Sequence, residues 1–243
     1  MIMEKYVLEQ IEKIREILYK SSHAVFFGGA GVSTDSGIPD FRSSSGLYSE
    51  QSNEYYLSRS CLFDEPQKFF EFYRKNMIFP DAKPNKTHLA LAELENKGII
   101  KAVITQNIDG LHQAAGSGTV IELHGTVNRS YCMNCKKVFR GEYINGGTGI
   151  PVCDSCGGMV RPDVTLYEEN LDGFSIYEAA GHIDSADVLI VGGTSLRVFP
   201  AAGFVQDFKG ENLIIINRDP TPFDRKAQFV LRESLSEVFS MLL

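Results

Sequence analysis

The chain has 243 residues, and its 31 acidic and 24 basic side chains give a net charge of −7. This balance argues against a protein that follows nucleic-acid backbones, so nucleic acid is not an expected partner. No run of about 18 apolar residues appears, and the N-terminus lacks the uncharged apolar stretch of a signal peptide, so we expect no membrane span and a cytoplasmic location.

Apolar residues recur at helical spacing through the first twenty residues and predict an amphipathic helix. Residues Ala24–Phe27 form an apolar run that predicts a buried strand entering a glycine turn. The Ser- and Tyr-rich stretch Ser43–Ser60 predicts an irregular loop, which we expect to be mobile alone and ordered by ligand. Helices are predicted at Pro66–Met77 and His88–Lys97.

The rest of the chain alternates between β-branched runs and helical segments. Ile99–Thr105 and Val120–Leu123 predict strands on either side of a short helix at Leu111–Ala115. Val188–Val191 and Leu213–Ile216 predict two further strands. This alternation predicts an α/β fold with a Rossmann-like, mostly parallel sheet and helices on both faces.

The segment Asn128–Arg161 interrupts this rhythm. It is rich in Cys and Gly, and it has too few apolar residues to fold without a cross-link such as a disulfide or a structural metal. Four cysteines in it form two C-x₂-C pairs, which predict a structural zinc site rather than disulfides: Cys132, Cys135, Cys153 and Cys156. Four thiolates leave zinc no open position, which argues against a zinc hydrolase. Reduced thiols that bind nothing and a nucleic-acid-binding zinc ribbon are the weaker alternatives.

Two domains are therefore expected. The larger would be Rossmann-like, and the smaller would combine a loop and helical module with a zinc ribbon. The predicted ranges are 1–41, 84–128 and 162–243 for the first and 42–83 and 129–161 for the second.

The glycine turn reads GGAGVSTDSGIPDFR from Gly28 to Arg42. Its glycines allow a close backbone approach, and a helix after the turn would offer free N–H groups to a phosphate. A dinucleotide fits this pattern, and a plain tight turn is the alternative. The acidic strand end that a dehydrogenase places about 20 residues later is missing, which argues against that class.

A second polar segment, TQNIDGLH, follows the strand that ends at Thr105. Ligands of open α/β sheets bind beyond the carboxyl ends of strands, so Gln106, Asn107 and Asp109 are candidates to orient a ribose and a carboxamide. His124 follows the next strand and precedes a glycine, which favours a role in proton transfer. The other histidines are expected to be structural or exposed: His23, His88, His112 and His182.

These motifs, in this order, resemble the sirtuin family. The similarity covers GAGVST with SGIPDFR, TQNIDGLH, the His-Gly pair, the two C-x₂-C pairs, GTSL and IIN, from about residue 24 to residue 217. The resemblance implies an NAD-dependent protein-lysine deacylase that cleaves NAD to nicotinamide and O-acyl-ADP-ribose while it frees lysine. NAD would be a co-substrate, zinc would be structural, and the partners would be acylated-lysine proteins or peptides.

The resemblance also implies residue roles. His124 would be the general base, and Asn107 and Asp109 would be further catalytic residues. The positions that would contact NAD are Ala30, Gly31, Thr34, Asp40, Phe41, Arg42, Gln106, Asn107, Ile108, Asp109, Thr194, Ser195 and Asn217. The substrate peptide would pair with Val164, Thr165, Leu166, Tyr167 and Glu168.

The chain departs from the family pattern at a few positions. Glu168 stands where a glycine is usual, and we expect it to exclude a backbone with positive φ. Arg197 replaces an aliphatic residue. Tyr73 and Arg74 are adjacent rather than three apart, which predicts removal of acetyl or longer apolar acyl groups rather than acidic ones. Mono-ADP-ribosyl transfer and a non-catalytic NAD-binding scaffold are the alternative functions.

Overall fold

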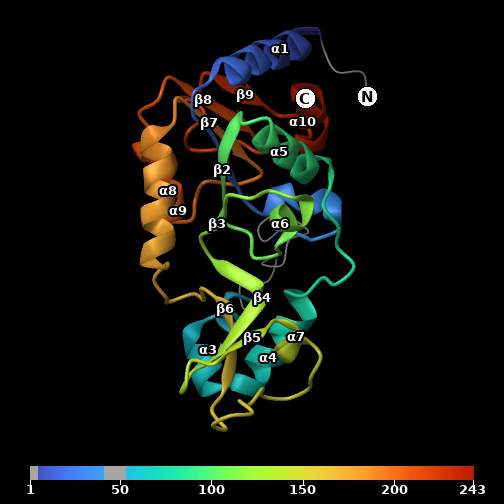
Figure 1. Cartoon of the computed structure of the whole chain (residues 1–243), viewed down its shortest axis with the longest axis vertical. Helices are drawn as coiled ribbons and strands as arrows, with labels where there is room; N and C mark the ends of the chain where they lie inside the picture. The colour runs from blue at the N-terminus through green and yellow to red at the C-terminus, as the bar shows by residue number, and fades with distance from the viewer. Residues whose placement is uncertain (1–4, 41–52) are drawn as a thin grey trace.

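The computed structural model describes residues 5–40 and 53–243, and its central element is a six-stranded parallel sheet (Figure 1). The strand order is β3-β2-β1-β7-β8-β9, with every pair parallel. The strands are β1 Ala24–Gly28, β2 Ile100–Thr105, β3 Val120–Glu122, β7 Val188–Gly192, β8 Asn212–Ile216 and β9 Phe229–Leu231. This is the order of the doubly wound dinucleotide-binding fold, so the predicted α/β class is confirmed.

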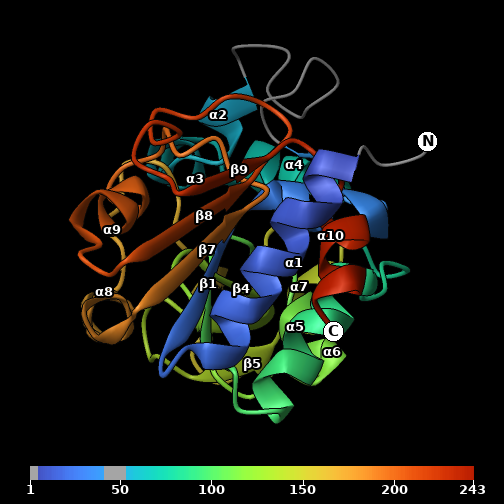
Figure 2. The same cartoon turned by 90° about the horizontal axis from the view of Figure 1, so that it is seen from above.

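Helices cover both faces of this sheet (Figure 2). One face packs on α1 Lys5–Lys20, α5 Lys86–Asn96 and α10 Leu235–Leu242, and the other on α8 Gly173–Ser185 and α9 Ala201–Asp207. Along β1, Ala24 and Phe26 point into the first core, while Val25 and Phe27 point into the second. This alternation of side chains explains why the strand is apolar throughout.

A second, three-stranded antiparallel sheet lies at the end of the molecule away from both termini (Figure 1). It contains β4 Gly125–Cys132, β5 Val138–Arg140 and β6 Val160–Val164. Its neighbouring helices are α2 Asn53–Tyr56, α3 Arg59–Asp64, α4 Pro66–Asn76 and α7 Glu142–Asn145. The residues here form a third core cluster, which includes Phe69, Tyr73 and Val160. The proposed domain boundaries stay a prediction.

Two local predictions are wrong. The glycine turn leads into two short 3₁₀ helices, η1 Ala30–Val32 and η2 Thr34–Ser36, instead of a longer helix. The predicted loop Ser43–Ser60 lies outside the described residues as far as position 52. From Asn53 it contains α2 and then the start of α3, which has its own N-cap: the Ser58 hydroxyl accepts the Cys61 N–H over 3.0 Å.

The predicted helices that become α4 and α5 are present, and α6 Leu111–Ala115 coincides with its predicted range. Cys61 is fully buried in the third core cluster, consistent with a small buried residue. Within residues 5–40 and 53–243, no helix combines the length and the hydropathy that a bilayer crossing requires.

Candidate active site

The glycine turn after β1 packs directly on the loop after β7. Gly29 N–H donates to Gly192 O over 3.2 Å, and Gly31 N–H donates to Gly193 O over 2.8 Å. A Cβ at Gly31 would lie 2.7 Å from the Gly193 Cα, so a side chain there would separate the two loops. Strands β1 and β7 are neighbours where the strand order reverses, which is where open α/β sheets bind nucleotides.

A buried polar network joins the loop after β2 to the glycine turn. Asn107 Nδ2 donates to Ser33 Oγ over 3.1 Å, and Ser33 Oγ donates to Asp109 Oδ2 over 2.6 Å. The second oxygen of Asp109 accepts the Leu111 N–H over 2.9 Å and fixes the start of α6. Residue-type reasoning placed Asn107 and Asp109 in the site but missed Ser33, whose only signal was its place in the glycine-rich motif.

Gln106 connects the same loop to β7 and to His124. Its backbone N–H donates to Gly28 O over 3.0 Å, and its Nε2 donates to Thr194 Oγ1 over 3.0 Å. Its carbonyl oxygen lies 2.8 Å from His124 Nδ1. Because a carbonyl only accepts, Nδ1 must carry the proton, and Nε2 of the neutral ring keeps its lone pair. Burial lowers the pKa of His124, and the hydrogen bond to Gln106 opposes this shift only partly.

The remaining predicted NAD contacts follow the same edge of the sheet. Thr34 Oγ1 donates to Gly31 O over 3.0 Å. Ser195 follows Thr194 after β7, and Asn217 follows β8, where its Nδ2 donates to Asp219 O over 2.8 Å. Ala30, Asp40 and Ile108 are half-buried, whereas Phe41 and Arg42 lie outside the described residues. The binding and catalytic roles of all these residues stay predictions.

Two of the other histidines are buried beneath the site. His88 and His112 have ring centroids 4.7 Å apart, and His88 Nδ1 accepts the Asn85 N–H over 3.2 Å at the start of α5. Burial lowers the pKa of His88 to about 4 and that of His112 to about 3. Both rings are therefore neutral at physiological pH and belong to the packed interior.

His23 and His182 lie at the opposite edge of the sheet. Their Nε2 and Nδ1 atoms are 3.2 Å apart, and the rings are half-buried. Burial and the neighbouring His182 lower the pKa of His23. Their distance from the carboxyl ends of the strands agrees with a structural role.

The expectation for Glu168 is wrong. This residue has φ 72, the left-handed conformation that favours glycine. Its carboxylate Oε2 accepts the Ser60 N–H over 2.9 Å and the Ser60 hydroxyl over 2.7 Å. These two bonds to α3 offset the conformational cost, which is about 1 kcal/mol for a residue with a Cβ. Arg197, the other departure, is exposed and follows Leu196, which has φ 51.

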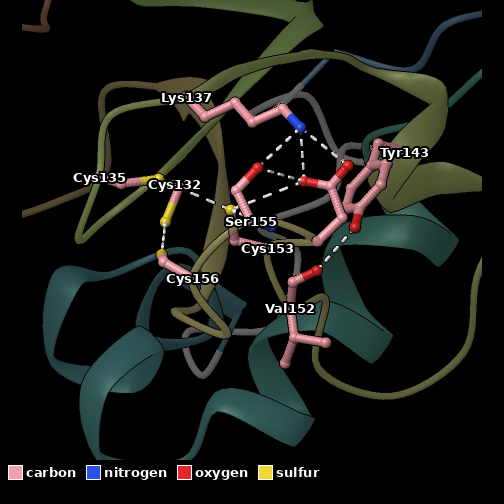
Figure 3. Close-up of polar contacts among 9 residues, drawn as sticks. Cys132, Cys135, Lys137, Tyr143, Val152, Cys153, Ser155 and Cys156 are labelled. Carbon is pink, nitrogen blue, oxygen red and sulfur yellow. Dashed lines mark hydrogen bonds and ion pairs between the residues drawn. The ribbon is translucent and has the colours of Figure 1, made fainter.

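The four predicted metal ligands converge on one another (Figure 3). Their Sγ atoms all lie within 4.8 Å of one another, and the Cys132–Cys156 and Cys135–Cys153 sulfur pairs are 3.4 and 3.6 Å apart. A disulfide needs about 2.05 Å, whereas thiolates around zinc at about 2.3 Å lie about 3.8 Å apart. The donor set and spacing fit one tetrahedral zinc ion.

Both C-x₂-C pairs use the same backbone turn. Lys136 N–H donates to Cys132 O and Gly157 N–H donates to Cys153 O, over 3.1 and 2.9 Å. Lys136 and Gly157 also share a positive φ, 63 and 70. Lys137 Nζ bridges the two turns through Asp154 Oδ1 and Oδ2, at 2.6 and 2.8 Å (Figure 3). Two matched turns that face each other present four sulfurs to one centre.

Comparison with known proteins agrees with this geometry. The model of the Sir2 family matches residues 29–200. This chain belongs to the Sir2, or sirtuin, family. Proteins named NAD-dependent protein deacetylase are similar to it over nearly their whole length. The Clostridium acetobutylicum relative is 51% identical over 98% of this chain and 99% of its own length, and the Clostridium tetani relative is 53% identical over 93% and 94%.

Solved sirtuin structures share the fold. A Sir2 with a deacetylated p53 peptide and 3′-O-acetyl ADP ribose is 39% identical and superposes with a TM-score of 0.88 over 96% of each chain. A Sir2 with a p53 peptide and NAD⁺ is 39% identical and has a TM-score of 0.84 over 95% of each chain. The sirtuin fold thus extends over almost the whole chain, and the four cysteines lie within the matched region.

Proposed function

We propose that this sirtuin is an NAD-dependent protein deacetylase that cleaves NAD to nicotinamide and O-acetyl-ADP-ribose and frees the lysine of a protein or peptide. The observation that carries the proposal is the neutral His124, whose Nδ1–H is fixed on Gln106 O at 2.8 Å. It sits at the same sheet edge as the Asn107–Ser33–Asp109 network. The relatives named NAD-dependent protein deacetylase support the same activity.

His124 acts as the general base. The acetyl-lysine oxygen first displaces nicotinamide from C1′ of the ribose. With the proton on Nδ1, the Nε2 lone pair then takes a proton from a ribose hydroxyl, which attacks the former carbonyl carbon of the acetyl group, and water completes the release of lysine. The imidazolium that forms keeps its Nδ1–H bond to Gln106 O, so the ring does not have to turn between the two states. Burial of the ring keeps it neutral, and therefore basic, at pH 7.

NAD binds across the junction of β1 and β7. The backbone of Ala30 and Gly31, together with Thr34, faces the phosphates, and Thr194 and Ser195 approach from the β7 side. Asp40, Ile108 and Asp109 line the nicotinamide end, and Asn107 and Gln106 orient the ribose. Asn217, after β8, contacts the adenosine ribose. Phe41 and Arg42 complete the set as predictions from the sequence.

The acetylated peptide pairs with the segment Val164–Glu168. Thr165 N–H donates to His124 O over 2.9 Å, so the segment runs directly beside the base. Addition of an extended peptide to such a segment relies on backbone hydrogen bonds and tolerates side-chain changes. This supports a broad set of protein substrates.

Zinc holds the small domain together and takes no part in the reaction. Four thiolates saturate a tetrahedral ion and leave no position for an activated water. Cysteine pairs that bind metal rather than form disulfides also support a cytoplasmic location.

The products identify the reaction. The protein is mixed with NAD and an acetylated peptide, and the mixture is analysed by mass spectrometry. We expect the deacetylated peptide, nicotinamide and acetyl-ADP-ribose in equal amounts. ADP-ribose attached to the protein substrate instead would indicate mono-ADP-ribosyl transfer. NAD that binds and stays intact with every acylated peptide would leave only a scaffold function and would overturn the proposal.

A further inference from the structure

Glu168 lies in the predicted peptide-binding segment, outside the polar network of the active site. Thr165, three residues earlier, donates its N–H to His124 O over 2.9 Å. Val164 and Leu166 on either side of Thr165 are buried, whereas Glu168 is exposed. A peptide that places an acetyl-lysine at His124 and follows this segment therefore meets the Glu168 carboxylate within a few residues.

The position of Glu168 is fixed by helix α3. Tyr167 N–H donates to Leu57 O over 3.1 Å, and Arg59 N–H donates to Tyr167 O over 3.0 Å. The two Ser60 bonds then hold the carboxylate itself at a backbone with φ 72. A carboxylate held at both its backbone and its Oε2 loses little conformational entropy when it meets a ligand.

Neighbouring acidic residues are neutralised by arginines. Asp163 forms an ion pair with Arg129. Glu169 forms one with Arg161 at 2.6 Å, in which both side chains are largely buried. Glu168 differs from both, because its hydrogen-bond partner Ser60 is neutral and no ion pair to Glu168 exists among the described residues.

The positive charge of Arg59 acts on Glu168 without forming an ion pair. The Arg59 guanidinium lies over the Phe63 ring, 4.7 Å from its centroid, and among the described residues it forms no ion pair with Glu168. The hydrogen bonds from Ser60 lower the pKa of the Glu168 carboxyl group, and the charge of Arg59 helps to lower it. The carboxylate is therefore ionised throughout the neutral range, on a residue that is exposed to solvent.

We propose that Glu168 is a specificity-determining residue that favours acetylated peptides with Lys or Arg near the acetyl-lysine. The inference rests on the proposed deacetylase function, since it assigns a preference to the same peptide-binding segment. A sirtuin with glycine at this position has no carboxylate there to provide such a preference.

Three peptides test the proposal. They share one acetyl-lysine and carry two Arg, two Ala or two Glu within two residues of it. We expect kcat/KM for the Arg peptide to exceed that for the Glu peptide about fivefold at low salt, because exposed ion pairs contribute up to about 1 kcal/mol. The ratio should shrink as salt is raised toward about 0.5 M.

Three variants separate the effect of the charge from that of the fold. Glu168→Gln removes the charge and should bring the Arg-to-Glu ratio close to one, whereas Glu178→Gln removes an exposed charge on α8 and should leave the ratio unchanged. Ser60→Ala removes one hydrogen bond but not the charge, so most of the ratio should remain. A ratio that Glu168→Gln leaves intact, or a wild type that deacetylates all three peptides equally, overturns the inference alone. Absence of deacetylation of every peptide overturns the proposed function.

Discussion

The hydroxyl of Ser33 is hydrogen-bonded to both Asn107 and Asp109, and it connects the glycine turn to the loop after β2. Among the described residues, the Asp109 carboxylate accepts one hydrogen bond from the Ser33 hydroxyl and one from the Leu111 N–H, and Ser33→Ala removes the first. Hydrogen bonds to charged groups contribute about 1.5–3 kcal/mol, so kcat/KM for NAD should fall about 10- to 100-fold.

Steady-state nicotinamide release measures this effect. Ser33→Thr keeps a hydroxyl and should recover part of the loss. Ser36→Ala is the matched control, because Ser36 lies in the adjacent 3₁₀ turn and accepts a hydrogen bond from Asn85 Nδ2 at 3.0 Å, outside the Asn107–Ser33–Asp109 network. Equal losses in the Ser33 and Ser36 alanine variants would contradict a specific role for the Ser33 hydroxyl.

His124→Ala should reduce turnover about 10²- to 10⁴-fold, the usual contribution of a general base, while NAD still binds. Because burial places the pKa of His124 below its ordinary 6.5, the base form predominates at every pH above that value. The rate should therefore be flat from pH 6.5 to 8 and decline only in more acidic solution. His182→Ala, at the opposite edge of the sheet, should match wild type. Turnover of His124→Ala within tenfold of wild type would exclude the role.

Much of the large domain follows from the sequence, because its buried strands are uninterrupted apolar runs. The sequence predicts strands at Ala24–Phe27 and Val188–Val191, because a strand that is buried on both faces of the sheet is apolar at every position. The short strand β9 and helix α10 were not predicted. Three residues such as Phe229–Leu231 carry no distinctive pattern, and their pairing with β8 is a tertiary event.

The site was predictable only where residue type and position coincide. Asn107 and His124 follow strands, so the topology of the sheet brings them together. The role of Ser33 depends on contacts 74 and 76 residues away, which a local pattern does not contain. The positive φ of Glu168 was also missed, because the stabilising partner Ser60 is 108 residues away. Local preference was overridden by two distant hydrogen bonds.

Buried neutral histidines should make the protein sensitive to mild acid. The pKa of His112 is about 3 and that of His88 about 4, against about 6.5 when the chain is unfolded. The unfolded state therefore binds these protons first, so stability is complete above pH 6.5 and falls as pH drops toward 4. Each histidine contributes a slope of about 1.4 kcal/mol per pH unit in this window.

His112→Phe tests this slope. No hydrogen bond to either ring nitrogen of His112 exists among the described residues, so an aromatic replacement breaks none. At pH 8 the free energy of unfolding should change by less than about 1.5 kcal/mol. Urea unfolding between pH 6.5 and 4.5 should show a slope about 1.4 kcal/mol per pH unit smaller than that of wild type. An unchanged slope would mean that His112 already binds a proton in the folded protein.

Loss of zinc should unfold the small domain. Cys135→Ala leaves three thiolates, and we expect the metal content to drop well below one ion per chain and the melting temperature to fall. Cys61→Ala is the control, since Cys61 is buried in the same core cluster but lies apart from the four sulfurs. Metal analysis with thermal unfolding checks both. A Cys135→Ala protein with full zinc content would contradict the four-cysteine site.

The hydrogen bonds of Arg74 should determine which acyl groups are removed. Its Nε and Nη2 donate to Ile144 O and Gly149 O over 2.8 and 2.7 Å, and Tyr73 is buried in the core of the small domain. A guanidinium held by two backbone carbonyls is not available to bind the carboxylate of an acidic acyl group. The acetyl and decanoyl forms of one peptide should therefore be deacylated at least about tenfold faster than the succinyl form, since an unpaired charge at the site costs more than about 1.4 kcal/mol. Faster removal of succinyl would show that Arg74 leaves its backbone partners or that another cation binds the succinyl carboxylate.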